Sequence, residues 1–201
     1  MIVRDRMSHP AVTATTTTKT KDALQMMYVR KIRRLPVVDE RGKLVGIVTQ
    51  RDLFEKGKAI TPIGEIMTSD PYNTSPEVSI VQAAALMRTL GVGTLPVLDR
   101  GQVVGIITES DIFDAFLELL GARRAGVRLI VPLPDIGGGV AKVLQALAPT
   151  GASLTGLTTF VERGRPALIL TADERDPRDL VRALSTAGFE PTLISVQEVA
   201  A

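Results

Sequence analysis

The sequence predicts an α/β (α+β) protein in which two similar β-α-β-β-α units precede a β-α-β-β-α-β domain. The first observation behind this prediction is an internal repeat, since GIVTQRD at 46–52 returns as GIITESD at 105–111. The second is that helical and extended apolar patterns follow the same order around both copies. The third is the last third of the chain, where these patterns alternate in the split βαβ order of ferredoxin-like folds.

The repeated segment is much longer than this phrase. RLPVVDERGKLVGIVTQRDLF at 34–54 corresponds to TLPVLDRGQVVGIITESDIF at 94–113. The offset between matching residues is 60 before the turn and 59 after it, and a surface turn tolerates a one-residue deletion most easily. Upstream, DALQMM in the first copy corresponds to QAAALM in the second. Residues 1–60 and 61–120 are therefore expected to form two structural repeats.

Each copy is expected to contain a short extended segment, an amphipathic helix, a hairpin and a second helix. In the second copy, apolar residues between Ile80 and Met87 share one helical face. Ser79 and Gln82 have the spacing of a capping box at the start of that helix. The two apolar runs that follow in each copy flank a turn with glycine, which is typical of a hairpin, and the second helix begins near TQRD or TESD.

These paired LPVV and GIVTxxD blocks resemble the CBS domain, and their tandem arrangement resembles a Bateman module. The resemblance covers roughly residues 1–120. It implies two repeats packed about a pseudo-two-fold axis, with two clefts between them. It also implies that the clefts bind an adenine nucleotide or adenosyl compound, with AMP, ADP, ATP and S-adenosylmethionine as the candidate ligands.

A threonine and an aspartate three residues apart, at the start of a helix, suit a nucleoside phosphate. The threonine hydroxyl can cap the helix, whose free N–H groups and positive dipole end can hold a phosphate. A carboxylate one turn later only accepts hydrogen bonds, so it suits the two hydroxyl groups of a ribose. Alternatively, both residues only cap their helix. The residue chemistry and the family resemblance both assign two such clamps, formed by Thr49 with Asp52 and by Thr108 with Asp111.

The two clamps are expected to differ in charge. The first copy reads IRRLPV and TQRD, which places Arg33, Arg34 and Arg51 near its clamp, whereas the second has Thr94 and Glu109 instead. Arginine binds phosphate bidentately through its planar fork. We therefore predict tighter binding of phosphorylated ligands at the first clamp, the alternative being that these arginines form a solvated face.

The C-terminal third is predicted to be a separate domain at 127–199, after a basic, glycine-flanked linker at 121–126. It resembles an ACT domain through PDIGGGVAKVLQAL and GASL, although serine and glycine stand where that family usually has asparagine and proline. In ACT domains the first loop can bind an amino acid at a subunit interface. Alternatively, the three glycines only permit a tight turn and close helix–sheet packing, and the domain serves dimerisation. The residues of the candidate amino-acid site are Asp135, Gly137, Gly138, Gly139 and Ser153.

Composition disfavours several function classes. The chain lacks cysteine and has one histidine, so thiolate or imidazole catalysis and a metal site are not expected. A net charge of +2 and 3% aromatic residues do not indicate nucleic-acid binding. No apolar run approaches the ~20 residues that span a membrane.

The sequence thus predicts a cytoplasmic, non-catalytic regulatory protein that forms a homodimer and acts on an unidentified protein. The order CBS–CBS–ACT resembles bacterial acetoin-utilisation-type proteins. The alternatives are an adaptor that serves only dimerisation, without nucleotide binding, and an amino-acid sensor acting through the ACT-like domain.

Overall fold

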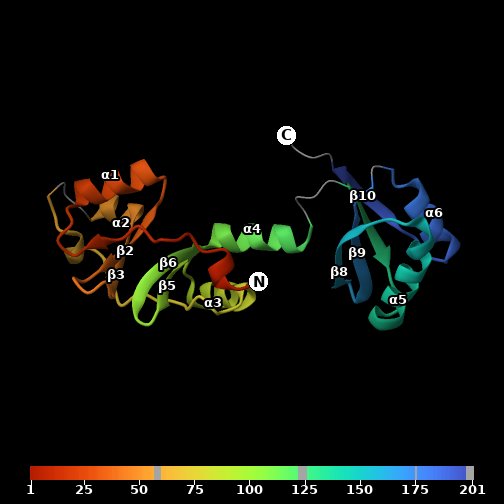
Figure 1. Cartoon of the computed structure of the whole chain (residues 1–201), viewed down its shortest axis with the longest axis horizontal. Helices are drawn as coiled ribbons and strands as arrows, with labels where there is room; N and C mark the ends of the chain where they lie inside the picture. Colours follow the sequence, from red (N-terminus) through yellow and green to blue (C-terminus); the bar gives the residue numbers. More distant parts are fainter. Residues whose placement is uncertain (57–59, 122–125, 175, 198–201) are drawn as a thin grey trace. The chain divides into compact units, whose positions relative to one another are not determined.

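The computed structural model describes residues 1–56, 60–121, 126–174 and 176–197 (Figure 1). The chain divides into two compact units, Met1–Ala115 and Phe116–Ala201.

The first unit contains the two predicted repeats in the predicted order of elements. The first repeat contributes β1 (Ala14–Thr15), α1 (Thr20–Arg30), β2 (Arg34–Val38), β3 (Leu44–Thr49) and α2 (Gln50–Glu55). The second contributes the 3-10 turn η2 (Ile63–Glu65), β4 (Thr68–Ser69), α3 (Ile80–Leu90), β5 (Thr94–Asp99), β6 (Gln102–Thr108) and α4 (Glu109–Leu119), whose last residues belong to the second unit. The β-α-β-β-α prediction is confirmed for both copies.

The two hairpins have the same register. In the first, Arg34 lies opposite Thr49 across the antiparallel β2–β3 pair. In the second, Thr94 lies opposite Thr108 across β5–β6. Residues 34 and 94 therefore occupy equivalent positions beside the start of the following helix. The hairpins and the preceding helices bury equivalent apolar residues, namely Ala23, Met27, Leu35, Val37 and Val48 in one repeat and Ala83, Met87, Leu95, Val97 and Ile107 in the other.

The segment that leads into each repeat packs on the other repeat. The N-terminal turn η1 (Val3–Asp5) bonds to the second repeat, where Val3 N–H donates to Val78 O over 2.8 Å. Further along, Ser8 forms a bridge with Ile106 of β6. In the other direction, β4 pairs with β3 in a four-stranded sheet of order β1-β2-β3-β4. The two repeats are thus joined by an exchange of these leading segments.

Helix ends follow local sequence signals. Ser79 and Gln82 form the predicted capping box at the start of α3, since the Ser79 Oγ accepts from the Gln82 N–H over 3.2 Å. Gly91 ends α3 in the left-handed region, with φ of 64°, where glycine avoids a steric penalty. These two residues fix where the chain enters β5.

The second unit is a four-stranded antiparallel sheet of order β10-β7-β9-β8. One face packs against both helices through a core that includes Leu129, Leu168, Val143 and Leu180. This β-α-β-β-α-β arrangement confirms the predicted ferredoxin-like fold. Its elements are β7 (Gly126–Pro132), α5 (Ile136–Leu147), the turn η3 (Ala148–Thr150), β8 (Leu154–Glu162), β9 (Arg165–Ala172), α6 (Arg178–Thr186) and β10 (Thr192–Gln197).

Most of the predicted linker at 121–126 lies outside the described residues, since 122–125 are not described and Gly126 already belongs to β7. Across the described residues, no helix is both long and apolar enough to cross a bilayer.

We expect the exchange of leading segments to depend on two bare glycines. A Cβ atom at Gly46 would overlap Sδ of Met67 and lie 2.9 Å from its Cγ, and a Cβ at Gly105 would lie 2.5 Å from Sδ of Met7. Gly46→Ala should therefore destabilise the protein by about 1–3 kcal/mol through overpacking. Denaturant unfolding of Gly46→Ala, Met67→Ala and the double variant measures this loss. The double variant should be no less stable than Met67→Ala alone. If Gly46→Ala lowered the free energy of unfolding equally in the wild type and in Met67→Ala, the proposed contact would be contradicted.

Candidate ligand clefts

Two clefts lie between the repeats, and each contains one of the predicted Thr/Asp clamps or part of it. The Thr49 cleft, of about 320 Å³, is lined by Arg34, Ile47, Thr49, Thr68, Asp70, Pro71, Tyr72, Val92, Gly93 and Thr94. The Thr108 cleft, of about 470 Å³, is lined by Ser8, Pro10, Ala11, Val12, Lys31, Ile32, Arg33, Arg34, Ile106, Thr108, Ser110 and Asp111. Both volumes fall within the range of small-molecule sites.

The walls of each cleft come from both repeats because the leading segments are exchanged. The Thr49 cleft combines the end of β3 with the segment after β4 and the residues that enter β5. The Thr108 cleft combines the end of β6 with residues 8–12 and with residues 31–34, which enter β2. Thr94 therefore faces the clamp of the first repeat, and Arg33 faces the clamp of the second.

This exchange changes where the predicted arginines lie. Arg34 lines the Thr49 cleft as expected, and it also lines the Thr108 cleft. Arg33 lies beside the first clamp as expected, since its carbonyl accepts from the Gln50 N–H over 2.9 Å, and it also lines the Thr108 cleft. Arg51 is exposed on α2, where its Nε donates to Glu55 Oε1 over 2.7 Å, and it is absent from the lining of both clefts. Lys31, which the sequence did not single out, adds a further cation to the Thr108 cleft.

Both clamps form capping boxes at the start of a helix. The Oδ2 atom of Asp52 accepts hydrogen bonds from the Thr49 N–H over 3.0 Å and from the Thr49 hydroxyl over 2.6 Å. In return, the Asp52 N–H donates to Thr49 Oγ1. Thr108 and Asp111 repeat this pattern, with distances of 2.8 and 2.7 Å to the carboxylate. Each threonine hydroxyl thus donates to its own aspartate, and a phosphate would have to redirect it.

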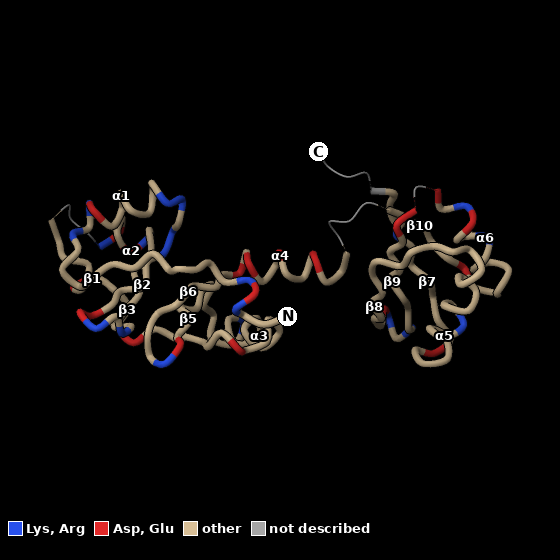
Figure 2. Tube along the Cα trace, in the orientation of Figure 1, with Lys and Arg blue, Asp and Glu red and all other residues tan. Residues whose placement is uncertain are grey.

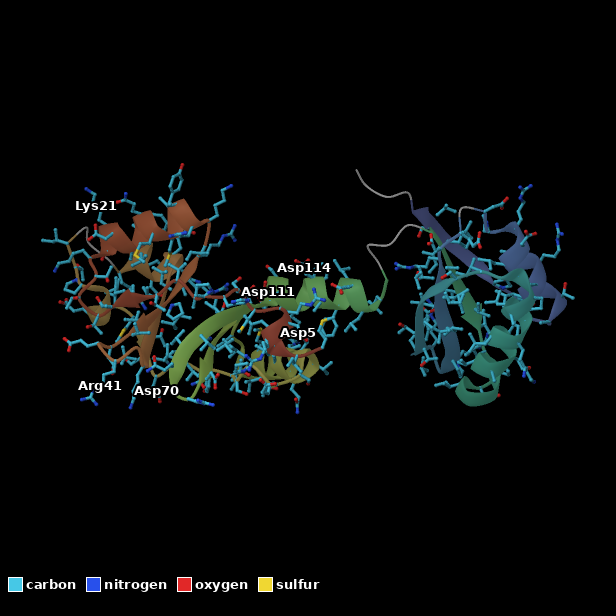
Figure 3. The ribbon with its side chains drawn as sticks, viewed as in Figure 1. Asp5, Lys21, Arg41, Asp70, Asp111 and Asp114 are labelled. Carbon is cyan, nitrogen blue, oxygen red and sulfur yellow. The ribbon has the colours of Figure 1, made fainter. Side chains whose placement is uncertain are left out.

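The two carboxylates differ in their second oxygen. Oδ1 of Asp52 accepts from Lys56 Nζ over 3.0 Å, so both oxygens of this carboxylate are engaged, and Asp52 does not line its cleft. Asp111, labelled near the start of α4 in Figure 3, does line its cleft, and within the described residues its Oδ1 has no hydrogen-bond partner. Asp111 therefore has an acceptor free for a ligand hydroxyl.

Electrostatics also separate the two aspartates. Partial burial raises the pKa of the Asp52 carboxyl, but hydrogen bonds from Thr49 and Lys56 and the charge of Lys56 outweigh it, so the net pKa lies below its ordinary value. The carboxylate form of Asp52 is thus stabilised by the fold. This is the pattern of a structural helix cap.

The comparison with known proteins agrees with this architecture. A family model for the CBS domain matches residues 3–58 and 63–118, which together are more than half of the chain. The chain belongs to the CBS-domain family. No family model assigns the second unit, so its likeness to an ACT domain remains a prediction.

Curated relatives include stand-alone CBS proteins and CBS regions of enzymes. A CBS domain-containing protein of Dictyostelium discoideum is 34% identical over 137 residues, which are 60% of this chain and 94% of that protein. Inosine-5′-monophosphate dehydrogenase of Aquifex aeolicus is 40% identical over 125 residues, which are 57% of this chain and 26% of the enzyme. The similarity to the enzyme therefore concerns one region of it.

Solved CBS pairs cover the same part of the chain. A protein named as acetoin utilization protein AcuB, from Vibrio cholerae, has a TM-score of 0.55 and 35% identity, over 60% of this chain and 93% of that chain. The CBS pair of protein MJ0100, in complex with 5′-methylthioadenosine and S-adenosyl-L-methionine, has a TM-score of 0.55 and 33% identity, over 58% and 95%. CBSX2 in complex with AMP has a TM-score of 0.54 and 25% identity, over 59% and 97%.

The predicted amino-acid site in the second unit is arranged as a helix cap. Asp135 Oδ1 accepts from the Gly138 N–H over 2.6 Å at the start of α5, so this carboxylate and this N–H already bind each other. Gly139 is buried, and a Cβ there would lie 3.1 Å from Leu133 Cβ, which accounts for the glycine by close packing. Ser153 is exposed, and its carbonyl accepts from Asp173 N–H. The amino-acid site remains a prediction.

We predict that Asp52 stabilises the CBS pair in a pH-dependent way. Its folded pKa is depressed, so its contribution is present above the unfolded pKa of ~3.9 and is lost as the pH falls through the folded pKa. Asp52→Asn keeps an acceptor but removes the charge that strengthens the hydrogen bonds from Thr49 and Lys56, so it should lower the free energy of unfolding by about 1 kcal/mol at pH 7. Urea unfolding between pH 2 and pH 7 measures the difference. A difference that persists unchanged at pH 2 would contradict this role.

Proposed function

We propose that the CBS pair is a non-catalytic sensor that binds an adenine nucleotide in the Thr108 cleft. The observation that carries this proposal is the lining of that cleft, where Lys31, Arg33 and Arg34 stand with the open carboxylate oxygen of Asp111. The basic residues can pair with a phosphate, and the carboxylate can accept hydrogen bonds from ribose hydroxyls.

The remaining wall supports the same ligand class. Val12, Ile32 and Ile106 give the Thr108 cleft an apolar part on which a purine can pack. Three cations line this cleft among the described residues, whereas Arg34 is the one cation in the described lining of the Thr49 cleft. We therefore assign the stronger phosphate site to the second clamp, in place of the first clamp that the sequence favoured.

The Thr49 cleft has a different charge balance. Its charged lining residues are Arg34 and Asp70, and Tyr72 adds an aromatic ring. Asp70 and Tyr72 together favour an adenosyl ligand that carries little negative charge or a positive group. MJ0100 in complex with 5′-methylthioadenosine and S-adenosyl-L-methionine is a CBS pair with ligands of that class.

Ligand binding would act by favouring one arrangement of the repeats. Each cleft takes its walls from both repeats, so a bound nucleotide contacts both at once. Because a ligand shifts an equilibrium only through differential affinity, binding must favour one arrangement over another to give a signal. We infer that the second unit or a partner copy in a homodimer responds to this shift. Neither cleft lining includes a histidine or cysteine among the described residues, which favours sensing over catalysis.

We predict that AMP, ADP and ATP bind more tightly to the wild-type protein than S-adenosylmethionine does, measured by calorimetric titration. Asp111→Asn retains an acceptor for the helix cap but loses the carboxylate, and Arg33→Ala loses one cation. Each should weaken the stronger AMP site by roughly 10–100-fold, the value of a charge-assisted hydrogen bond or two.

Arg51→Ala is the matched control, because Arg51, like Arg33, is an exposed arginine of the first repeat, and it lies outside both clefts. It should leave AMP affinity unchanged. Saturable binding that Arg51→Ala weakens as much as Arg33→Ala would contradict the assignment of the site. No heat and no thermal stabilisation with any of the four ligands would favour the adaptor alternative.

A further inference from the structure

The two clefts share one side chain. Among the described residues that line them, Arg34 alone belongs to both. Lys31 and Arg33 line only the Thr108 cleft, and Asp70 lines only the Thr49 cleft. Among the described lining residues, Arg34 is therefore the one cation of the Thr49 cleft and one of three in the Thr108 cleft.

The guanidinium of Arg34 has no fixed partner. Within the described part of the chain, its side chain has no hydrogen bond and no ion pair, although it is half-buried. It lies over Gly93, since a Cβ atom at Gly93 would be 3.0 Å from Arg34 Nη2 and 2.7 Å from Glu109 Oε2. The Glu109 N–H donates to Gly93 O over 3.2 Å. The bare backbone of Gly93 is thus where the arginine of one repeat meets the start of α4 in the other.

The repeat does not supply a second such arginine. Thr94 occupies the position equivalent to Arg34, is 6% exposed and donates its hydroxyl to Gly93 O over 2.6 Å. Gly93 in turn occupies the position equivalent to Arg33. Glu109, at the first turn of α4, adds a negative charge beside the shared cation, in a helix that carries only acidic charges (Figure 2).

We propose that Arg34 couples the two clefts, so that a phosphate bound in one cleft weakens the binding of a phosphate in the other. This inference rests on the proposed function of nucleotide binding. A guanidinium that forms a bidentate pair with one phosphate cannot offer the same fork to a second. Once Arg34 turns to the Thr108 cleft, the Thr49 cleft keeps Asp70 as its charged lining residue, which repels a phosphate.

The coupling must be reciprocal. Linkage requires that each ligand change the affinity of the other cleft by the same factor. Because Lys31 and Arg33 also serve the Thr108 cleft, that cleft fills first with a nucleotide. A ligand without phosphate does not pair with Arg34, so its affinity for the Thr49 cleft should be the same whether or not the Thr108 cleft holds a nucleotide.

The test uses AMP as the probe and closes the clefts one at a time. Ser8 and Thr68 are exposed, line one cleft each and occupy equivalent positions in the two repeats. Ser8→Trp closes the Thr108 cleft, and Thr68→Trp closes the Thr49 cleft. Should Ser8→Trp lower the melting temperature, the exposed Ser110 offers Ser110→Trp as a second closing variant.

We expect the full chain to bind its second AMP about five- to tenfold more weakly than the single-cleft variants predict for independent sites, within the usual range of coupling. Arg34→Gln should weaken AMP in both single-cleft variants and make the two-cleft protein additive. Arg33→Gln, the matched control, should weaken only the Thr108 cleft and keep the non-additivity. In the wild type, 5′-methylthioadenosine should bind the Thr49 cleft with the same affinity, within about twofold, with and without AMP.

The outcomes separate the two proposals. Independent AMP sites in the wild type, or non-additivity that survives Arg34→Gln, would overturn the coupling while leaving nucleotide binding intact. An absence of AMP binding to the wild type would overturn the proposed function and the coupling together.

Discussion

The exchange of leading segments between the repeats is the contact on which both clefts depend. Met7 packs on the bare backbone of Gly105, and Met67 packs on that of Gly46. The flexible side chain of methionine suits such a contact, because it fills the space that a missing Cβ leaves over a strand. This packing holds Ser8 against β6 and residues 68–70 against β3, and the residues that follow, 10–12 and 71–72, line the clefts. If either leading segment packed on its own repeat instead, the hairpin of the other repeat would lack the residues that form the opposite wall of its cleft.

The exchange of leading segments also explains why the sequence predicted the secondary structure of the site but not how its charges are distributed between the clefts. Elements, caps and hairpin registers depend on residues close together in the chain, so the repeat and the capping signals were enough to predict them. The distribution of charge between clefts depends on contacts between repeats. Proximity along the chain predicted Arg33 beside Thr49, where its carbonyl does bond to Gln50, but only the fold shows that Arg33 also lines the Thr108 cleft. Lys31 carried a signal in the basic run VRKIRR, but only the fold shows which cleft that run borders.

Equivalent sequence does not make the two Thr/Asp pairs equivalent in chemistry. Asp52 and Asp111 accept the same two hydrogen bonds from their threonines, and what separates them is the residue four positions later. Lys56 holds the second oxygen of Asp52, while Ala115 at the matching position is apolar. That spacing was visible in the sequence as an i, i+4 pair. The bound carboxylate serves the helix, and the open one remains available to a ligand, so the same motif supports a structural role in one copy and a binding role in the other.

A pseudo-symmetric pair with a single central arginine differs physically from two independent sites. If both repeats had arginine at this position, each cleft would keep its own cation and neither would respond to the other. If neither had it, the clefts would communicate only through the general electrostatic field, which salt screens within about 10 Å. With Arg34 in one repeat and Thr94 in the other, the clefts compete for a group in direct contact with both linings. The asymmetry of the repeat is therefore what makes the occupancy of one cleft relevant to the other.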